Sequence, residues 1–232
     1  MHPRALATDY DGTLADHGRV EEPTFAALEW LRVAGLKVIL VTGRVLDELR
    51  EVCPRLDLFD RVVAENGALL YRSGDGSDRV LATPPPVSFV EALQARGVGP
   101  ISVGRVIVAT WKPHEDVVLD VIRTTGLRLQ VILNKRAVMV LPTGVNKASG
   151  LAVALDELGI APDRVAAIGD AENDQEFLAL CGLAAAVANA VPSLKERTDM
   201  VTRRAHGAGV AELIDRLLAG DCLGGAGRVV CG

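Results

Sequence analysis

Short apolar runs alternate along the chain with longer stretches whose apolar residues recur at helical spacing. The first such unit has an apolar run at residues 5–8, an amphipathic stretch at 22–34 and a second apolar run at 37–41. The same alternation returns later, where the apolar run 165–168 follows a helical stretch that begins near Asn146. Strands that alternate with helices are typical of βαβ units, so the pattern predicts an α/β fold with a Rossmann-like, doubly wound parallel sheet.

The middle of the chain has a different pattern. Residues 72–86 are rich in Gly, Ser, Asp and Pro, which is typical of a loop and a stiff connector. A predicted helix at 87–95 precedes a strand at 102–111, a helix at 115–125 and two strands that face each other across Asn134-Lys135. Strand pairs joined by tight turns indicate antiparallel sheet, so this segment is predicted to be a small α+β cap domain inserted into the core.

These patterns divide the chain into four segments. The core is predicted to occupy residues 1–83 and 144–219, and the cap residues 84–143. Residues 220–232 are Gly-rich and have neither periodicity nor a plausible core face. We expect them to form a flexible tail.

Composition and charge exclude some classes of function. Hydrophobic residues make up 49% of the 232 residues and charged residues 24%, the balance of a soluble globular protein. The formal net charge of −5 argues against nucleic acid or a membrane surface as a partner. No apolar run approaches the roughly 20 residues that a membrane-spanning helix needs, and we expect a cytoplasmic protein. The scattered residues Cys53, Cys181, Cys222 and Cys231 are expected to be reduced thiols.

The segment Thr8-Asp9-Tyr10-Asp11-Gly12-Thr13-Leu14 follows a buried-type strand and places two carboxylates just beyond its end. Open parallel sheets bind ligands at that edge. Positions i and i+2 of an extended segment point to the same side, so Asp9 and Asp11 can address one reacting centre. One carboxylate can attack phosphorus while the other serves as acid and base. The alternative is a structural turn in which Asp11 caps the backbone.

Two further candidate segments also lie at the end of a predicted strand or the start of a predicted helix. Thr42-Gly43-Arg44 lies between the end of an apolar strand and a predicted helix, where a hydroxyl and free N–H groups suit a phosphate oxygen. Lys147 begins a predicted helix directly after the insert. Taken singly, Thr42 is also explained as a helix N-cap and Lys147 as an exposed surface lysine.

A fourth signal is the acidic segment Gly169-Asp170-Ala171-Glu172-Asn173-Asp174, which follows the apolar run 165–168. Clustered carboxylate and amide oxygens suit Mg²⁺, which prefers hard oxygen ligands. An acidic loop that caps a helix is the structural alternative.

In this order and at these positions, the four signals together resemble the haloacid-dehalogenase (HAD) superfamily. Residues 9–13 look like its first motif, 42–44 its second, Lys147 its third, and Gly169-Asp170 with Asn173-Asp174 its fourth. An insert between the second and third motifs, with Glu65-Asn66-Gly67 before it, is similar to the type-two-capped branch, also called Cof-like or HAD-IIB. The resemblance implies a phosphatase with an aspartyl-phosphate intermediate.

The resemblance also implies a role for each motif residue. Asp9 is expected to be the nucleophile, Asp11 the general acid and base, and Lys147 the residue that balances charge. Expected to bind the substrate phosphate are Thr42, Gly43, Arg44 and Asn173. Expected to bind Mg²⁺ are Asp9, Asp11 through its carbonyl, Asp170 and Asp174. The acid at position 11 favours a phosphatase over a dehalogenase, which lacks it.

Several alternatives stay open at the level of sequence. The same chemistry is compatible with a phosphotransferase or phosphomutase, and the same fold with a non-catalytic regulatory protein. A receiver domain is disfavoured, because the chain is about twice too long and the third motif has no phosphoacceptor Asp. The expected partner is a small phosphorylated metabolite, a sugar phosphate or phosphoglycolate-like compound, and the chain a monomer or homodimer. Candidate substrate contacts in the cap are Arg105, Lys112, His114, Lys135 and Arg136.

Overall fold

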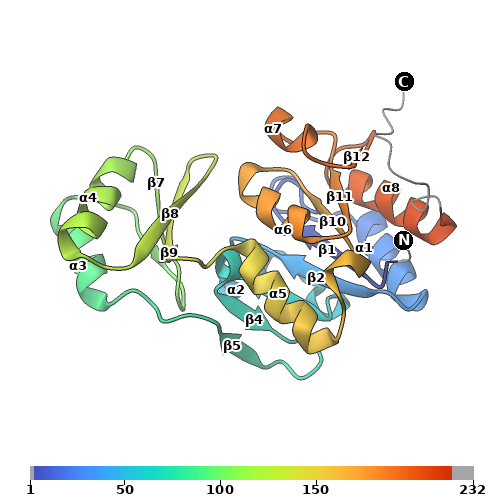
Figure 1. The fold of residues 1–232 in the computed structure, drawn as a ribbon, viewed down its shortest axis with the longest axis horizontal. Coiled ribbons are helices and arrows are strands. Elements are labelled where there is room, and N and C mark those ends of the chain that lie inside the picture. Colours follow the sequence, from blue (N-terminus) through green and yellow to red (C-terminus); the bar gives the residue numbers. More distant parts are fainter. Residues whose placement is uncertain (1–2, 221–232) are drawn as a thin grey trace.

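A computed structural model describes residues 3–220 of the protein. Within this range the chain forms a large α/β core and a smaller cap that lies to one side of it (Figure 1). The predicted α/β fold with an inserted cap is thereby confirmed. Apart from Gly220, the predicted tail lies outside the described residues, as do Cys222 and Cys231. The two described cysteines, Cys53 and Cys181, are free.

The core is built on an eight-stranded sheet with the order β12-β11-β10-β1-β2-β3-β4-β5. Neighbouring strands are parallel from β12 to β3, and β4 and β5 are antiparallel additions at one edge. Along the chain the core strands are β1 (Ala5–Asp9), β2 (Lys37–Val41), β3 (Arg61–Ala64), β4 (Leu69–Tyr71), β5 (Asp78–Val80), β10 (Val165–Gly169), β11 (Leu183–Ala186) and β12 (Met200–Val201).

Helices cover both faces of this sheet (Figure 1). Helix α1 packs against α8, and α5 packs against α6. The core helices are α1 (Glu22–Val33), α2 (Leu46–Val52), α5 (Lys147–Leu158), α6 (Gln175–Leu180), α7 (Pro192–Lys195) and α8 (His206–Ala219), with short 3-10 turns η1 (Leu56–Leu58), η2 (Glu65–Gly67), η3 (Pro162–Arg164) and η4 (Glu172–Asp174). Among the described helices, none is long and apolar enough to cross a membrane.

Two parts of the core differ from the sequence expectation. Strand β5 lies inside residues 72–86, which we predicted to be loop and connector. Two of its three residues are charged and it pairs only with β4 at the sheet edge, so it lacks the apolar pattern that marks a buried strand. Helix α8 begins at His206, earlier than the predicted residue 210, because Gly207 and Gly209 allow its first turn to pack closely against other segments of the core.

The cap is a four-stranded antiparallel sheet covered by two helices. Its helices are α3 (Val87–Ala95) and α4 (Glu115–Thr125), and its strands, in the sheet order β6-β7-β9-β8, are β6 (Ser102–Val103), β7 (Val108–Trp111), β9 (Ala137–Pro142) and β8 (Leu129–Asn134). The single strand that we predicted at 102–111 is instead a hairpin, because residues 104–107 leave the sheet to contact the core.

The cap has its own hydrophobic core and a second apolar junction with the large domain. Its helices and one sheet face enclose a buried cluster that includes Phe89, Leu93 and Val118. The other sheet face contributes Met139 and Leu141 to a separate cluster that contains Ala68 of the large domain. The open face of the cap sheet is therefore turned toward the core.

Candidate active site

The four sequence motifs meet at the carboxyl ends of the central parallel strands. Asp9 ends β1, Thr42 follows β2 directly, and Asp170 follows β10 directly. Strand β1 lies between β2 and β10, so these three ends are adjacent. Lys147 is the first residue of α5, whose N-cap Asn146 forms a capping box with Ser149.

Lys147 is the centre of a buried charged cluster. Its Nζ atom lies 2.5 Å from Asp9 Oδ1 and 2.5 Å from Asp174 Oδ1. All three residues are at most 4% exposed. An unpaired buried charge is costly, so a lysine held between two carboxylates fixes all three side chains in one arrangement.

Backbone groups hold Asp174 in place. Its Oδ2 atom accepts hydrogen bonds from the N–H groups of Asp170, at 2.9 Å, and Ala171, at 3.0 Å. Gly169 is required for this approach, because a Cβ atom there would lie 2.6 Å from Asp174 Oδ2. The loop after β10 is therefore shaped around this carboxylate.

Asp9, Asp170 and Asp174 together form a cluster that could hold a metal ion. One oxygen from each lies within 4.8 Å of the others, and all three residues are buried. Burial raises the pKa of Asp9, and Asp174 and Asp170 raise it further, although Lys147 opposes them. Burial and the neighbouring Asp174 likewise raise the pKa of Asp170. Buried Lys147 and the half-exposed Lys135, which contacts Asp170, do not balance three carboxylates, so the site suits a hard divalent cation.

Asp11 lies in different surroundings from Asp9. Its carboxylate forms a bidentate ion pair with Arg44, with Nε–Oδ2 and Nη2–Oδ1 distances of 2.7 Å each. The Asp11 side chain is 40% exposed, so it is open to solvent. Directly after Asp11, Gly12 has a φ of 90°. A Cβ atom there would also lie 2.3 Å from Asp170 Oδ2.

The predicted phosphate contacts lie around the same strand ends. The Thr42 hydroxyl is buried and accepts a hydrogen bond from the Arg44 N–H at 3.1 Å, which leaves its own proton free to donate. The Asn173 amide donates to Asn66 at 3.4 Å, and its Oδ1 atom is buried without a partner. The Arg44 guanidinium is occupied by Asp11, so substrate binding by this side chain stays a prediction.

The structure brings two further residues to the site, Lys135 from outside the four motifs and Thr13 from the first motif. Lys135, at the tip of the cap hairpin, places its Nζ atom 3.1 Å from Asp170 Oδ2. Thr13 donates its hydroxyl to Asp170 Oδ1 at 3.4 Å. The turn at Asn134-Lys135 signalled a hairpin, and Lys135 was one of five cap candidates. Nothing in a single sequence shows which of the five reaches the core.

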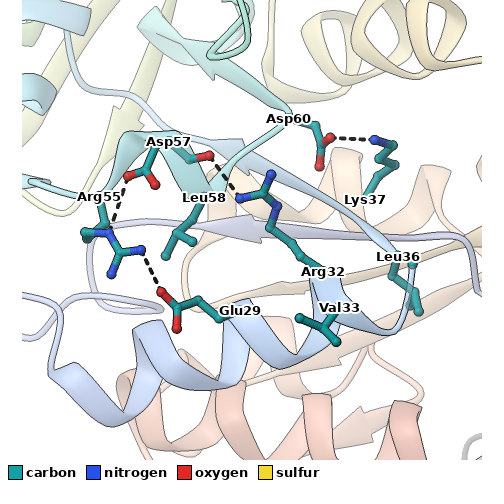
Figure 2. A pocket seen from close by; sticks show the side chains of 10 residues that line it. Glu29, Arg32, Val33, Leu36, Lys37, Arg55, Asp57, Leu58 and Asp60 are labelled. Carbon is teal, nitrogen blue, oxygen red and sulfur yellow. Dashed lines mark hydrogen bonds and ion pairs between the residues drawn. The ribbon is translucent and has the colours of Figure 1, made fainter.

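A surface pocket at the opposite end of the sheet has a different character (Figure 2). It lies between the end of α1 and the segment before β3. Its charged side chains pair with one another, as in Arg55–Glu29 at 2.6 Å and Lys37–Asp60 at 2.7 Å. Since these charges already have partners, the pocket shows no excess charge for a ligand.

Comparison with known proteins agrees with the geometry of the site. A family model described as haloacid dehalogenase-like hydrolase matches residues 6–85 and 130–214. A phosphoglycolate phosphatase of Methanothermobacter thermautotrophicus is 35% identical over 223 residues, which cover 93% of this chain and 99% of that protein.

Solved structures show the same fold at lower identity. A protein from Thermoplasma acidophilum superposes with a TM-score of 0.82 and 21% identity, over 94% of this chain and 99% of that one. A sugar phosphatase of HAD subclass IIB superposes with a TM-score of 0.74 and 21% identity, over 92% of this chain and 98% of that one.

Proposed function

The chain belongs to the haloacid dehalogenase-like hydrolase family and is a phosphatase, and from this premise we propose a magnesium-dependent mechanism in which Asp9 is the nucleophile. The observation that carries the proposal is the buried contact of Lys147 with both Asp9 and Asp174. A lysine held at this place offsets the negative charge that a substrate phosphate adds to the site.

We propose that Mg²⁺ is held by Asp9, Asp170 and Asp174 and by the backbone carbonyl of Asp11. The buried carboxylates carry more negative charge than Lys147 balances, which supports a divalent cation with oxygen ligands. When bound, the ion supplies positive charge that stabilises the phosphoryl oxygens. The Asp11 side chain is engaged by Arg44, which agrees with a role for its carbonyl alone in metal binding.

Electrostatic repulsion is the main obstacle to the first chemical step. Two negative unit charges about 4 Å apart repel by about 4 kcal/mol at an effective dielectric of 20. Lys147 lies against the Asp9 oxygen and reduces this repulsion. The Thr42 hydroxyl, the Gly43 N–H and the Asn173 amide are the proposed contacts of the phosphate oxygens.

The proposed reaction proceeds in two steps. In the first, an Asp9 oxygen forms a bond to phosphorus while the ester P–O bond breaks, and Asp11 donates a proton to the leaving oxygen. In the second, Asp11 takes a proton from water, which attacks phosphorus and releases inorganic phosphate and the free Asp9 carboxylate. Both Asp11 oxygens are paired with Arg44 in this structure, so one of these contacts must open for Asp11 to carry the proton that it donates.

The proposed substrate is a small phosphorylated metabolite, either a sugar phosphate or a phosphoglycolate-like compound. Relatives named phosphoglycolate phosphatase support the second class, and the HAD subclass IIB structure has the name of a sugar phosphatase. If an alcohol replaces water in the second step, the same site acts as a phosphotransferase. We propose a cytoplasmic monomer or homodimer.

The proposal is tested by trapping the phosphorylated enzyme. Rapid mixing with phosphoglycolate and Mg²⁺, followed by acid quench and peptide mass spectrometry, should find a phosphoryl group on Asp9. Excess chelator should abolish turnover and trapping together. Full hydrolysis in chelator contradicts the magnesium requirement, and turnover with a phosphoryl group on another residue contradicts the role of Asp9.

A further inference from the structure

The tip of the cap hairpin reaches the catalytic carboxylates. Strands β8 and β9 pair continuously from Leu129 and Pro142 to Asn134 and Ala137, and a two-residue turn joins them. The first turn residue, Lys135, has a φ of 54°, and its Nζ atom lies 3.1 Å from Asp170 Oδ2. A paired hairpin is a firm support, so the cap holds this ammonium group at the mouth of the site.

Other cap cations with ion pairs in the described part of the chain point elsewhere. Arg105 pairs with Asp78 on β5, at 3.0 Å, and Arg96 and Arg123 both pair with Asp120 within the cap. In residues 3–220, Lys135 is therefore the cap cation whose ion-pair partner belongs to the carboxylate cluster. Its side chain is 55% exposed, which leaves the ammonium accessible to a ligand.

The cap surface around Lys135 is mostly apolar. Ile132 pairs with Met139 and Asn134 with Ala137, so these four residues share the open face of the sheet. The Met139 sulfur lies close to the phosphate-binding loop, 3.4 Å from where a Cβ atom on Gly43 would be. Gln130 and Asn134 are polar exceptions on this face: Gln130 donates to the Val145 carbonyl, and the Asn134 Oδ1 atom is buried without a partner. Such a surface has few partners for the many hydroxyl groups of a sugar.

We propose that Lys135 is a specificity-determining residue that binds a carboxylate on the leaving group of the substrate. This inference rests on the proposed function, in which Asp170 is a ligand of Mg²⁺. Metal binding then engages the Asp170 carboxylate that Lys135 contacts in this structure, and the exposed ammonium group becomes free to bind another anion. A carboxylate in the leaving group supplies it, so the site selects a phosphorylated short hydroxy acid over a sugar phosphate.

The kinetic test uses two substrates of similar size, phosphoglycolate and ethyl phosphate, which has a methyl group in place of the carboxylate. Lys135→Gln should lower kcat/KM for phosphoglycolate roughly 10- to 100-fold, the range of a lost hydrogen bond to a charged group. Its kcat/KM for ethyl phosphate should change less than about twofold. Arg123→Gln is the control: this cap arginine is exposed and pairs with Asp120 away from the site, so its loss should leave both values unchanged.

A binding measurement gives a readout that does not depend on turnover. Calorimetry with Mg²⁺ present should compare 3-phosphonopropionate, which carries a carboxylate, with propylphosphonate, which does not. The wild-type protein should bind 3-phosphonopropionate at least roughly 10-fold more tightly than propylphosphonate. Lys135→Gln should remove this preference, and Lys135→Arg should keep part of it.

The outcomes separate this inference from the proposed function. If the wild type hydrolyses phosphoglycolate and Lys135→Gln slows both substrates equally, Lys135 binds the phosphate and the inference is wrong. Preference of the wild type for sugar phosphates over phosphorylated hydroxy acids also overturns it. If the wild type with Mg²⁺ hydrolyses no phosphate ester, including an activated aryl phosphate, the proposed function fails instead.

Discussion

Asp9 and Asp11 are two residues apart in the chain, yet their carboxylates lie in different surroundings. Asp9 is buried against Lys147, and Asp11 is partly exposed and held by Arg44. Two acids in different environments can take different roles, one as nucleophile and one as acid and base. The difference comes from contacts with residues far along the chain, so it is a property of the fold and not of the motif.

The proposed role of Asp9 predicts the effect of its closest substitution. Asp9→Asn keeps the size of the side chain but replaces the carboxylate with a much poorer nucleophile. Turnover of phosphoglycolate should fall more than tenfold, which corresponds to at least about 1.4 kcal/mol in the barrier. Steady-state rates measured with purified protein test this prediction. Retention of more than about a tenth of the wild-type rate contradicts the assignment of Asp9 as the nucleophile.

The carboxylate cluster predicts how pH changes the effect of magnesium on stability. Burial raises the pKa of Asp9 in the folded protein, so the folded state keeps a proton that the unfolded chain loses above its ordinary value of about 4. In the metal-free protein, the contribution of the Asp9 proton to the free energy of unfolding is complete below about pH 4, the pKa of the unfolded chain. It is lost as pH rises through the raised pKa of the folded state. Mg²⁺ competes with the same proton. The increase in Tm that Mg²⁺ causes should therefore be larger at about pH 8 than at about pH 6.

Thermal unfolding with and without Mg²⁺ at the two pH values measures this difference. Asp9→Asn has no proton to lose, so its Mg²⁺-dependent shift should change less with pH. An equal shift for the wild type at both values contradicts the coupling between Asp9 and the metal.

At the scale of elements, the positions of the motifs along the chain predicted which of their residues lie close together in the fold. Asp9, Thr42 and Asp170 each follow an apolar strand, and parallel strands bring such ends together, so the cluster could be inferred before the structure. The pairing of Asp11 with Arg44 could not be inferred, because it depends on side-chain direction. The same holds for Lys135, whose approach to Asp170 requires the orientation of the cap.

The split of the predicted strand 102–111 has a physical cause in the core. Glu65, at the end of β3, accepts hydrogen bonds from the N–H groups of Arg105, Val106 and Ile107 at 2.8, 2.7 and 2.9 Å. These bonds replace ladder bonds of the cap sheet and turn the loop toward the core. A side chain 40 residues away sets the break, so the local pattern of apolar residues did not predict it.

This contact predicts that Gly104 tolerates no side chain. A Cβ atom there would lie 2.7 Å from the Oε1 atom of Glu65 and 2.8 Å from Oε2, and the three hydrogen bonds prevent the carboxylate from moving away. Gly104→Ala should therefore loosen the loop at a cost of about 1–3 kcal/mol, typical of overpacking. Hydrogen exchange of the Arg105, Val106 and Ile107 amides should accelerate.

Gly74→Ala is the matched control for this substitution. No atom lies within 4 Å of a Cβ built at Gly74, so this change should leave the exchange of the three amides unaltered. Unchanged protection in Gly104→Ala means that the loop accommodates a methyl group and that Glu65 does not fix its position.

At the scale of the whole molecule, the division of labour between core and cap follows from where their residues lie. The proposed nucleophile, the proposed acid and base, Lys147 and the proposed metal ligands all come from the core. The cap has a separate hydrophobic cluster and contributes Lys135 and an apolar surface near Gly43. Chemistry and selectivity should therefore be separable.

The last prediction tests this separation by removing the cap. Replacing residues 87–141 with a short linker removes Lys135 and the apolar surface but none of the residues of the proposed phosphoryl chemistry. The value of kcat/KM for phosphoglycolate should fall strongly, because binding energy from the leaving group no longer orients the phosphate. Slow hydrolysis of an activated aryl phosphate should persist, since the departure of the aryl leaving group depends less on contacts between the protein and the part of the substrate outside the phosphate.

Truncation also exposes part of the junction, notably Ala68, which packs against Met139 and Leu141 in the intact protein. Circular dichroism and a cooperative thermal transition must therefore show first that the shortened chain is folded. Additional Mg²⁺-dependent stabilisation would show that the carboxylate cluster survives. If a folded protein without its cap keeps the full rate on phosphoglycolate and its preference over ethyl phosphate, the cap does not govern selectivity and its contact with Asp170 has only a structural role.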